Sequence, residues 1–341
     1  MNMTSVVNGT CGLYVDQHSK YKTWSDTSLF EVLVPETARV DTRHHFKMLK
    51  LLCLTVALAA TSQATCTRQS LTDITAAYIA AQKNGLPRVF ATLAAPSTVY
   101  TENGVAVPLT EGILAQSLKV DHTFSIHDTV QCGTFTEMIA ASNPHPYVIG
   151  TRILVGDDGK VKLMESIVTD EGDWAFNATG YLAWTSGENW APIPEGKRDT
   201  RAVIQAAGDA YFDRFASVNV SVPWGTPCAR LEGGAYTGGR NLSANTCELG
   251  LPSTIKVTNR RYIVDEEYGV VDMFLGFPGL DRSVGEQPMP DSHMFRVEGG
   301  KIRYIHTVSS CVHAGCGMNG AGPPMRRERR WRFRFNEQWS G

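Results

Sequence analysis

The feature that most constrains how this chain folds is an internal repeat. Residues 146–170 and 291–307 each contain two runs of alternating apolar and polar residues around a polar, glycine-containing turn, the pattern of a strand–turn–strand unit. A helical pattern lies upstream of each copy, from Leu71 in the first half and from Val203 in the second. The chain is therefore predicted to contain two versions of one α+β unit.

Aligning the two turns pairs residues of different chemistry. The pairs, with the first-copy residue named first, are Lys160 with Lys301, Arg152 with His293, Glu165 with His306 and Tyr78 with Tyr211. An Arg–Glu pair on neighbouring strands predicts a cross-strand salt bridge. Two histidines at the same positions point to chemistry instead, so we expect the first domain to be the scaffold and the second to be the working domain.

Composition changes along the chain indicate its segments. These are an N-terminal extension over 1–47, a signal peptide over 48–64, a first domain over 67–170, a Trp-rich connector over 171–198, a second domain over 199–316 and a basic tail over 317–341. Lys50 precedes an apolar run, and Ser62-Gln63-Ala64 forms a small-x-small cleavage site. The run is about half of the ~20 residues that a membrane-spanning helix needs, so no stable membrane anchor is expected. A signal peptide works poorly so far from the start, and we therefore expect residues 1–47 to come from a misassigned gene start.

The cysteines agree with a secreted or luminal protein. An even number of cysteines follows the predicted signal peptide, which indicates disulfides in a secretory context. Several pairings are possible; the favoured set is Cys228–Cys247, Cys66–Cys132 and Cys311–Cys316. Asn177, Asn219 and Asn241 begin N-glycosylation sequons. A zinc site is the less favoured alternative, so no metal is expected; its ligands would come from His293, His306, Cys311, His313 and Cys316.

Charge and motifs exclude several classes of function. A net charge of −2 with 19% charged residues argues against nucleic acid as a partner. The tail from Met325 mixes basic and aromatic residues, which can bind nucleic acid, but a solvated terminus is expected in a secreted chain. No P-loop, HExxH or GxSxG sequence occurs, and no GxGxxG follows a predicted strand. Chemistry without a cofactor remains.

The best candidates for catalysis are His293 and His306. Counting outward from the Gly299-Gly300 turn places them opposite each other on adjacent strands, on one face of the sheet. Imidazole titrates near neutral pH and suits acid–base work. The alternative is a pair of polar residues on an outer sheet face.

Other residues are candidates for supporting roles. Asp265 and Asp291 are expected either to orient the histidines or to form turns. Tyr262 and Tyr304 are expected either to donate hydroxyl hydrogen bonds or to belong to the core. The expected substrate contacts are Trp224, Arg230 and Phe295, and Arg230 is also expected to form a buried ion pair with Glu232 that holds a lid loop over 222–252. Weaker candidates in the first domain are His122 and Glu102.

The order of elements resembles a known superfamily. A helix, a strand segment, a short helix and a long curled antiparallel sheet are similar to the NTF2-like, or SnoaL-like, plan. The stretches VPWGTPCARLEGG, NRRYIVDEEYG and PDSHMFRVEGGKIRYIHT resemble secreted fungal proteins of uncharacterised domain type built from tandem units. The resemblance covers residues 67–311 and implies two cone-shaped domains. Superfamily members include isomerases, dehydratases and cyclases, and also binding modules.

Three classes of function follow. The first is a cofactor-independent isomerase, dehydratase or cyclase that acts on a hydrophobic polyketide or terpenoid intermediate of fungal secondary metabolism. Pericyclic cyclisation is included, because a shaped cavity can hold a reactive conformer. The second is a secreted module that binds a small ligand or another protein, and the third is a disulfide-stapled wall or matrix component.

Overall fold

The computed structural model describes residues 11–15, 21–25, 28–32, 66–239, 241, 243–278, 288–313 and 316. The predicted signal peptide and basic tail lie outside these residues. The chain forms two compact units, divided after Ala64. In the N-terminal unit, β1 (Cys11–Val15), β2 (Tyr21–Ser25) and β3 (Ser28–Val32) form an antiparallel sheet in chain order.

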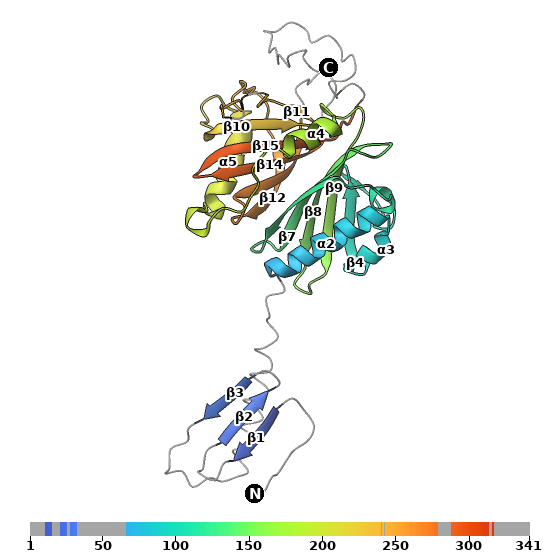
Figure 1. The fold of residues 1–341 in the computed structure, drawn as a ribbon, viewed down its shortest axis with the longest axis vertical. Helices are drawn as coiled ribbons and strands as arrows, with labels where there is room; N and C mark the ends of the chain where they lie inside the picture. Colours follow the sequence, from blue (N-terminus) through green and yellow to red (C-terminus); the bar gives the residue numbers. More distant parts are fainter. Residues whose placement is uncertain are drawn as a thin grey trace. The chain divides into compact units, whose positions relative to one another are not determined.

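The larger unit contains two similar halves (Figure 1). The first half consists of α2 (Arg68–Asn84), α3 (Pro87–Ala91), β4 (Ala94–Glu102), β5 (Val105–Ala106), η1 (Gly112–Ala115), β6 (His122–Asp128), β7 (Gly133–Ala140), β8 (Tyr147–Val155) and β9 (Val161–Thr169). The connector contributes α4 (Ala178–Thr185) and η2 (Glu195–Lys197). The second half consists of α5 (Arg201–Arg214), β10 (Trp224–Glu232), β11 (Ala235–Tyr236), β12 (Thr258–Asp265), β13 (Val270–Phe277), β14 (Met289–Glu298) and β15 (Lys301–Ser309).

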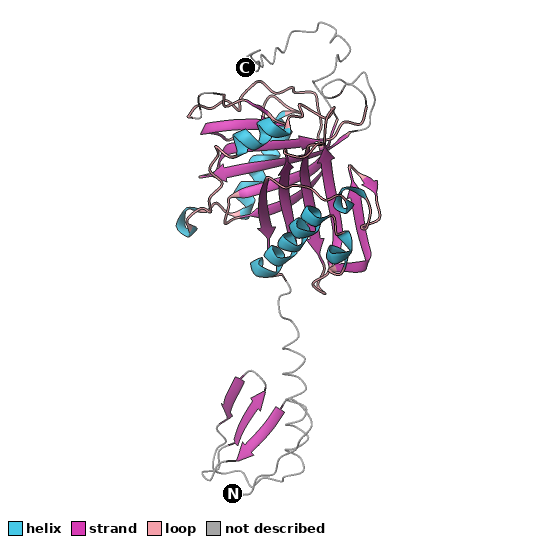
Figure 2. Ribbon diagram, turned by 45° about the vertical axis from the view of Figure 1, so that its right-hand side comes forward, coloured by secondary structure: helices cyan, strands magenta, loops and turns pink. Residues whose placement is uncertain are grey.

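The two halves have the same topology, as the repeat predicts. Their six-stranded sheets have the orders β5-β4-β9-β8-β7-β6 and β11-β10-β15-β14-β13-β12. In each sheet the strand that follows the long helix pairs in parallel with the last strand, as β4 does with β9 and β10 with β15. The sheets are therefore mixed, and they are not strongly curled (Figure 2). The α+β class is confirmed, whereas the purely antiparallel sheet was a wrong prediction.

The helix α2 shows why the sequence folds this way. Thr67 caps its N-terminus by accepting a hydrogen bond from the Ser70 backbone N–H at 3.0 Å, and Gly85 ends it with a φ of 61°. Between these signals, Leu71, Ile74 and Tyr78 are buried at helical spacing. They pack on one face of the first sheet, and α5 covers the matching face of the second sheet with its own buried residues.

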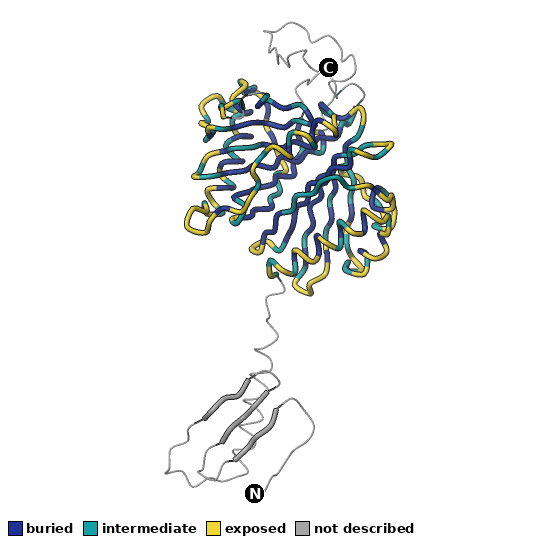
Figure 3. The backbone as a smooth tube through the Cα atoms, in the orientation of Figure 1, coloured by how far each residue is buried: buried dark blue, intermediate teal, exposed yellow. Residues whose placement is uncertain are grey.

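The remaining face of each sheet packs against the other half. A third core joins side chains of both sheets, including Phe135 of β7 and Phe274 of β13, whose ring centroids lie 6.0 Å apart. Figure 3 shows that the buried backbone follows the strands of both sheets. The order of layers is therefore helix, sheet, sheet, helix. The two predicted domains do have cores of their own, but they also share this one, and their weakly curled sheets do not form the predicted cones.

Two reciprocal ion pairs link the halves. Arg68, the first residue of α2, donates two hydrogen bonds to Asp265 at the end of β12, and Arg201, the first residue of α5, donates two to Asp128 at the end of β6. Each aspartate also accepts a backbone N–H from the opposite half, from His127 and Val264 respectively. Reciprocal contacts of this kind are typical of an interface with two-fold symmetry, here between the two halves of one chain.

All three favoured disulfides are present. Cys66 bonds to Cys132, Cys228 to Cys247 and Cys311 to Cys316. Three disulfides indicate an oxidising compartment. Within the described residues, no helix is both long and apolar enough to cross a membrane.

The reciprocal ion pairs give a test of this architecture. Arg201→Ala leaves the fully buried Asp128 carboxylate without its counter-ion, so we expect a loss of about 2–4 kcal/mol in the free energy of unfolding. Urea denaturation measures the loss. Arg88→Ala, at an exposed position of α3, is the control and should change the stability by less than about 0.5 kcal/mol. Equal stability of the two variants would contradict the role of this pair.

Candidate functional site

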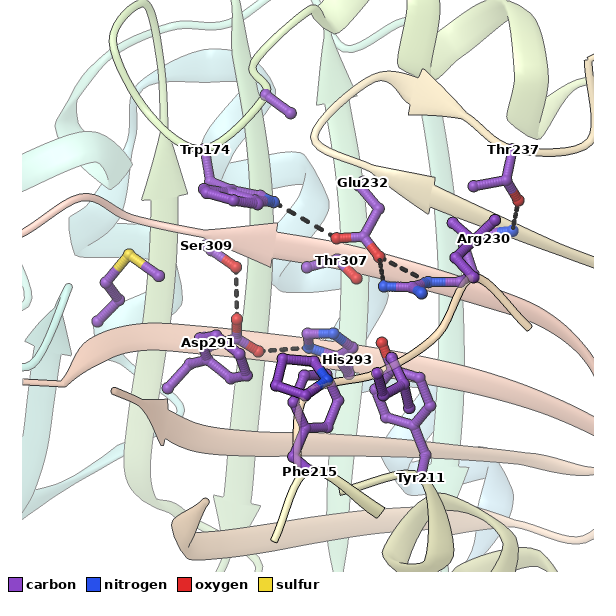
Figure 4. Close-up of a pocket in the computed structure, with 16 residues that line it drawn as sticks. Trp174, Tyr211, Phe215, Arg230, Glu232, Thr237, Asp291, His293, Thr307 and Ser309 are labelled. Carbon is purple, nitrogen blue, oxygen red and sulfur yellow. Dashed lines mark hydrogen bonds and ion pairs between the residues drawn. The ribbon is translucent and has the colours of Figure 1, made fainter. Parts of the chain in front are cut away.

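A cavity of about 60 Å³ lies between the second sheet and its helix. Its walls come from β10, β14 and β15, from α5, from the loop over 249–252 and from Trp174 of the connector (Figure 4). The charged and hydroxyl side chains used below are Tyr211, Arg230, Glu232, Asp291, His293, Thr307 and Ser309. Glu232, Thr307 and His293 are directly paired across three neighbouring strands, so alternation places them on one face.

The central feature is an Asp–His pair on β14. His293 Nδ1 lies 2.5 Å from Asp291 Oδ1, and the hydroxyl of Ser309 donates to the other oxygen of the same carboxylate. The exposed fractions of the Asp291 and His293 side chains are only 2% and 5%. Because Asp291 accepts the Nδ1 proton, the Nε2 atom of His293 is left to accept a proton from a ligand.

An ion pair forms the opposite wall. Arg230 donates from Nε and Nη2 to Glu232 Oε1 at 2.8 and 2.5 Å, which confirms the predicted pair. Burial disfavours both charges, but the attraction between them raises the pKa of Arg230 and lowers the pKa of Glu232. The Arg230 guanidinium also lies over the Tyr211 ring, 5.5 Å from its centroid. Both groups are therefore charged and held in place.

His306 does not belong to this cavity, so the prediction that the two histidines share a face was wrong. A regular hairpin would pair His293 with His306, but the pairing shifts by one residue after the turn and sets His293 opposite Thr307. One extra residue in a strand reverses the faces of all residues beyond it. His306 therefore points to the other half.

There His306 joins two carboxylates. Its Nδ1 lies 2.9 Å from Glu137 Oε2 of β7, and its Nε2 lies 2.6 Å from Glu188 Oε2 of the connector. Tyr181 donates to Glu137 at 2.6 Å, and Trp190 donates to Glu188 at 3.0 Å. Burial opposes the imidazolium, but the two carboxylates more than offset it and raise the pKa of His306 to about 10. The cluster ties both halves and the connector together.

The other predicted residues lie elsewhere. Asp265 holds Arg68, and the Tyr262 hydroxyl donates to Asp209 of α5 at 2.9 Å. Tyr304 packs against Trp190 on the inter-half side. Trp224 and Phe295 pack in the core around Tyr211 and do not line the cavity.

The weaker candidates, the glycosylation sequons and the predicted Arg–Glu salt bridge are distributed over both halves. Glu102 accepts a hydrogen bond from Tyr100, and His122 lies on the edge strand β6. Asn177, Asn219 and Asn241 are exposed, and their glycosylation stays a prediction. Arg152 and Glu165 form the predicted cross-strand salt bridge, with Arg152 Nη1 2.5 Å from Glu165 Oε2.

The first half serves as an internal reference for the site. Matching the strand pairings of the two halves places Thr151 where His293 stands, because Thr151 pairs with Ser166 as His293 pairs with Thr307. The same matching places Ile149 at the position of Asp291, Tyr100 at that of Arg230 and Glu102 at that of Glu232. Arg152 thus matches Met294 and not His293, because the first turn is one residue longer.

Sequence reasoning missed part of the site. Tyr211 was aligned with Tyr78 but given no role, while Thr307 and Ser309 were not considered. The alternation from His306 along the last strand places both of them on the opposite face from His306, and the correct register then brings them beside His293 and Asp291.

The comparison with known families finds a match in the second half. Residues 197–309 match a family model described as "Domain of unknown function (DUF8021)". This region spans α5 to β15 and includes the Asp–His pair and the Arg230–Glu232 pair. No curated protein matches the chain. The second half therefore contains a DUF8021 domain.

The pKa of His306 predicts a pH dependence of stability. A folded-state pKa of about 10 lies above the ordinary histidine value of about 6.5, so the stabilisation is complete below pH ~6.5 and is lost as the pH rises to about 10. We expect the free energy of unfolding to fall by up to about 1.4 kcal/mol per pH unit in this window. Urea denaturation across the pH series measures the slope.

The variant His306→Gln lacks the titrating group, so its slope should be smaller than that of the wild type. His145→Gln is the control, because His145 pairs with Asp170 at an exposed position. A wild-type slope that His306→Gln leaves unchanged would show that His306 does not carry the proton.

Proposed function

We propose that the second half is a cofactor-independent acid–base enzyme, an isomerase, dehydratase or cyclase, that acts on a small hydrophobic compound of the polyketide or terpenoid kind. The Asp291–His293 pair is the observation that supports this most. A buried imidazole oriented by a carboxylate is an arrangement that moves protons at neutral pH. We also propose that the halves are NTF2-like and that the protein is secreted.

The comparison between the halves argues that this pair is not required by the fold. The first half builds the same sheet and helix with Ile149 and Thr151 at the two positions. Burying an aspartate and a histidine costs free energy unless both are paired. Their presence in one half alone is best explained by function, and that half also provides Arg230.

The proposed roles follow from the contacts. Asp291 holds the ring of His293 and fixes the proton on Nδ1, while Ser309 holds Asp291 through its second oxygen. His293 takes a proton from the substrate at Nε2 and returns it at another atom. Apolar residues of the 249–252 loop and Phe215, directly after α5, exclude water from the cavity.

A second candidate is a secreted ligand-binding module. The cavity volume of about 60 Å³ favours it, because sites for drug-sized ligands are usually about 300–1,000 Å³. On the enzyme proposal, only the reacting end of the substrate enters the cavity. The two functions differ in whether a ligand leaves the protein chemically changed.

The test uses metabolite extracts from a producing strain in which this gene is deleted. Purified protein should convert one compound in the extract without added cofactor, as followed by liquid chromatography and mass spectrometry. His293→Thr, which introduces the residue of the first half, should stay folded and lose roughly 10²–10⁴-fold in rate. Asp291→Asn should lose a similar factor, because it releases the ring orientation.

Thr151→Ala at the matching position of the first half is the control and should retain the wild-type rate. A folded His293→Thr protein with full activity would contradict the acid–base proposal. Pericyclic catalysis, which depends on the shape of the cavity rather than on proton transfer, would then be the remaining explanation. A compound that is recovered unchanged from the protein would favour the binding module.

A further inference from the structure

We propose that the Tyr211 hydroxyl, Arg230 Nη1 and the Thr307 hydroxyl together bind a carbonyl oxygen of the ligand, next to the carbon that His293 deprotonates. The substrate class is then a carbonyl compound with an acidic C–H beside the carbonyl group. This inference rests on the proposed function and narrows it. It concerns the part of the cavity beside the Asp–His pair.

All three polar atoms are buried without a well-formed hydrogen bond. Among the residues that the structure describes, no partner meets normal hydrogen-bond geometry for any of them, although the Tyr211 hydroxyl and the Arg230 guanidinium lie close enough to interact. The residues are strongly buried, with exposed fractions of 0% for Tyr211, 5% for Arg230 and 1% for Thr307. A buried donor that makes no hydrogen bond is unfavourable, so three such donors in one place indicate a ligand group that accepts hydrogen bonds.

The three donors lie at the part of the cavity between the Arg230–Glu232 ion pair and His293. Glu232 binds Nε and Nη2 of Arg230 and leaves Nη1 free. Thr307 pairs directly with His293 on one side and with Glu232 on the other, so its hydroxyl lies between the base and the ion pair. Figure 4 shows the hydroxyls of Tyr211 and Thr307 near the Arg230 guanidinium, beside the His293 ring.

The first half differs from the second in how the matching side chains are hydrogen-bonded. There the matching residues satisfy one another, because the Tyr78 hydroxyl bonds to Thr151 Oγ1 at 2.8 Å and Thr151 bonds to Ser166 at 2.9 Å. In the second half the same three positions hold Tyr211, His293 and Thr307, which make no such chain. The fold can therefore satisfy these polar groups internally, as it does in the first half, but it does not do so in the second half.

Charge favours a carbonyl group over a permanent carboxylate. Glu232 and Asp291 lie at the same cavity as Arg230, so a carboxylate, whose second charged oxygen extends beyond the three donors, meets two carboxylates there. A neutral carbonyl avoids this repulsion and becomes negative only during reaction. Burial raises the pKa of Tyr211 above its ordinary value, which keeps the hydroxyl protonated as a donor.

The chemical step balances without a further reactant. His293 Nε2 takes the proton, the C–H electron pair becomes a C=C bond, and the carbonyl π pair moves to oxygen, where the three donors stabilise the enolate. Where the substrate has a C=C bond next to the deprotonated carbon, the enolate is conjugated with it, and returning the proton to the far carbon of that bond gives an isomer. Alternatively, the enolate expels a β-hydroxyl group, which takes the proton from His293 and leaves as water.

The test uses 4-nitrophenol as a probe, because its phenolate oxygen imitates an enolate oxygen and absorbs visible light. Titration of the bound probe should show that the phenolate binds at least about tenfold more tightly than the neutral phenol. Tyr211→Phe and Thr307→Val should each weaken phenolate binding roughly 10–100-fold. Tyr78→Phe in the first half is the matched control and should bind the phenolate as the wild type does.

Equal affinity for phenol and phenolate would overturn the proposal, as would wild-type phenolate binding in folded Tyr211→Phe and Thr307→Val proteins. Benzoate that binds more tightly than the phenolate through the same residues would show a carboxylate site and would also overturn it. A wild-type protein that converts a compound of the extract but shows no preference for the phenolate would refute this subsite alone. A wild-type protein that prefers the phenolate but converts no compound of the extract would refute the acid–base function alone.

Discussion

The packing of the two sheets against each other is the constraint on which the rest of this structure depends. Each sheet has its own helix on one face and the other half on the opposite face, so alternate residues of a strand enter different environments. On β15, Thr307 faces the cavity under α5, whereas His306 beside it is buried between the halves. The same alternation thus separates the residues that line the cavity from the cluster that links the two halves.

The duplication explains how one half can hold a costly polar site. The shared core, the Arg68–Asp265 and Arg201–Asp128 ion pairs and the His306 cluster stabilise both halves together. With this support, the second half can keep an aspartate, a histidine and an arginine buried around a cavity, where the first half has Ile149, Thr151 and Tyr100. The proposed function therefore rests on a difference between two copies of one fold.

The sequence predicted the parts of this structure that depend on local patterns. The helix pattern from Leu71, the repeated hairpins and the number of disulfides were predictable from the sequence, because each depends on a short stretch or on the cysteine count. The register across β14 and β15 was not readable, since one bulged residue has no distinct composition. That single residue moved His306 out of the site and brought Thr307 and Ser309 into it.

The central claim is that Asp291 fixes His293 as a base that faces the cavity. Long-range proton–nitrogen NMR of protein labelled with ¹⁵N-histidine, recorded at pH 8, tests it most directly, and the signals that disappear in His293→Thr assign the ring. The account predicts that Nδ1 carries the proton and that Nε2 is bare, because the carboxylate accepts from Nδ1. A neutral ring protonated at Nε2 would contradict the account.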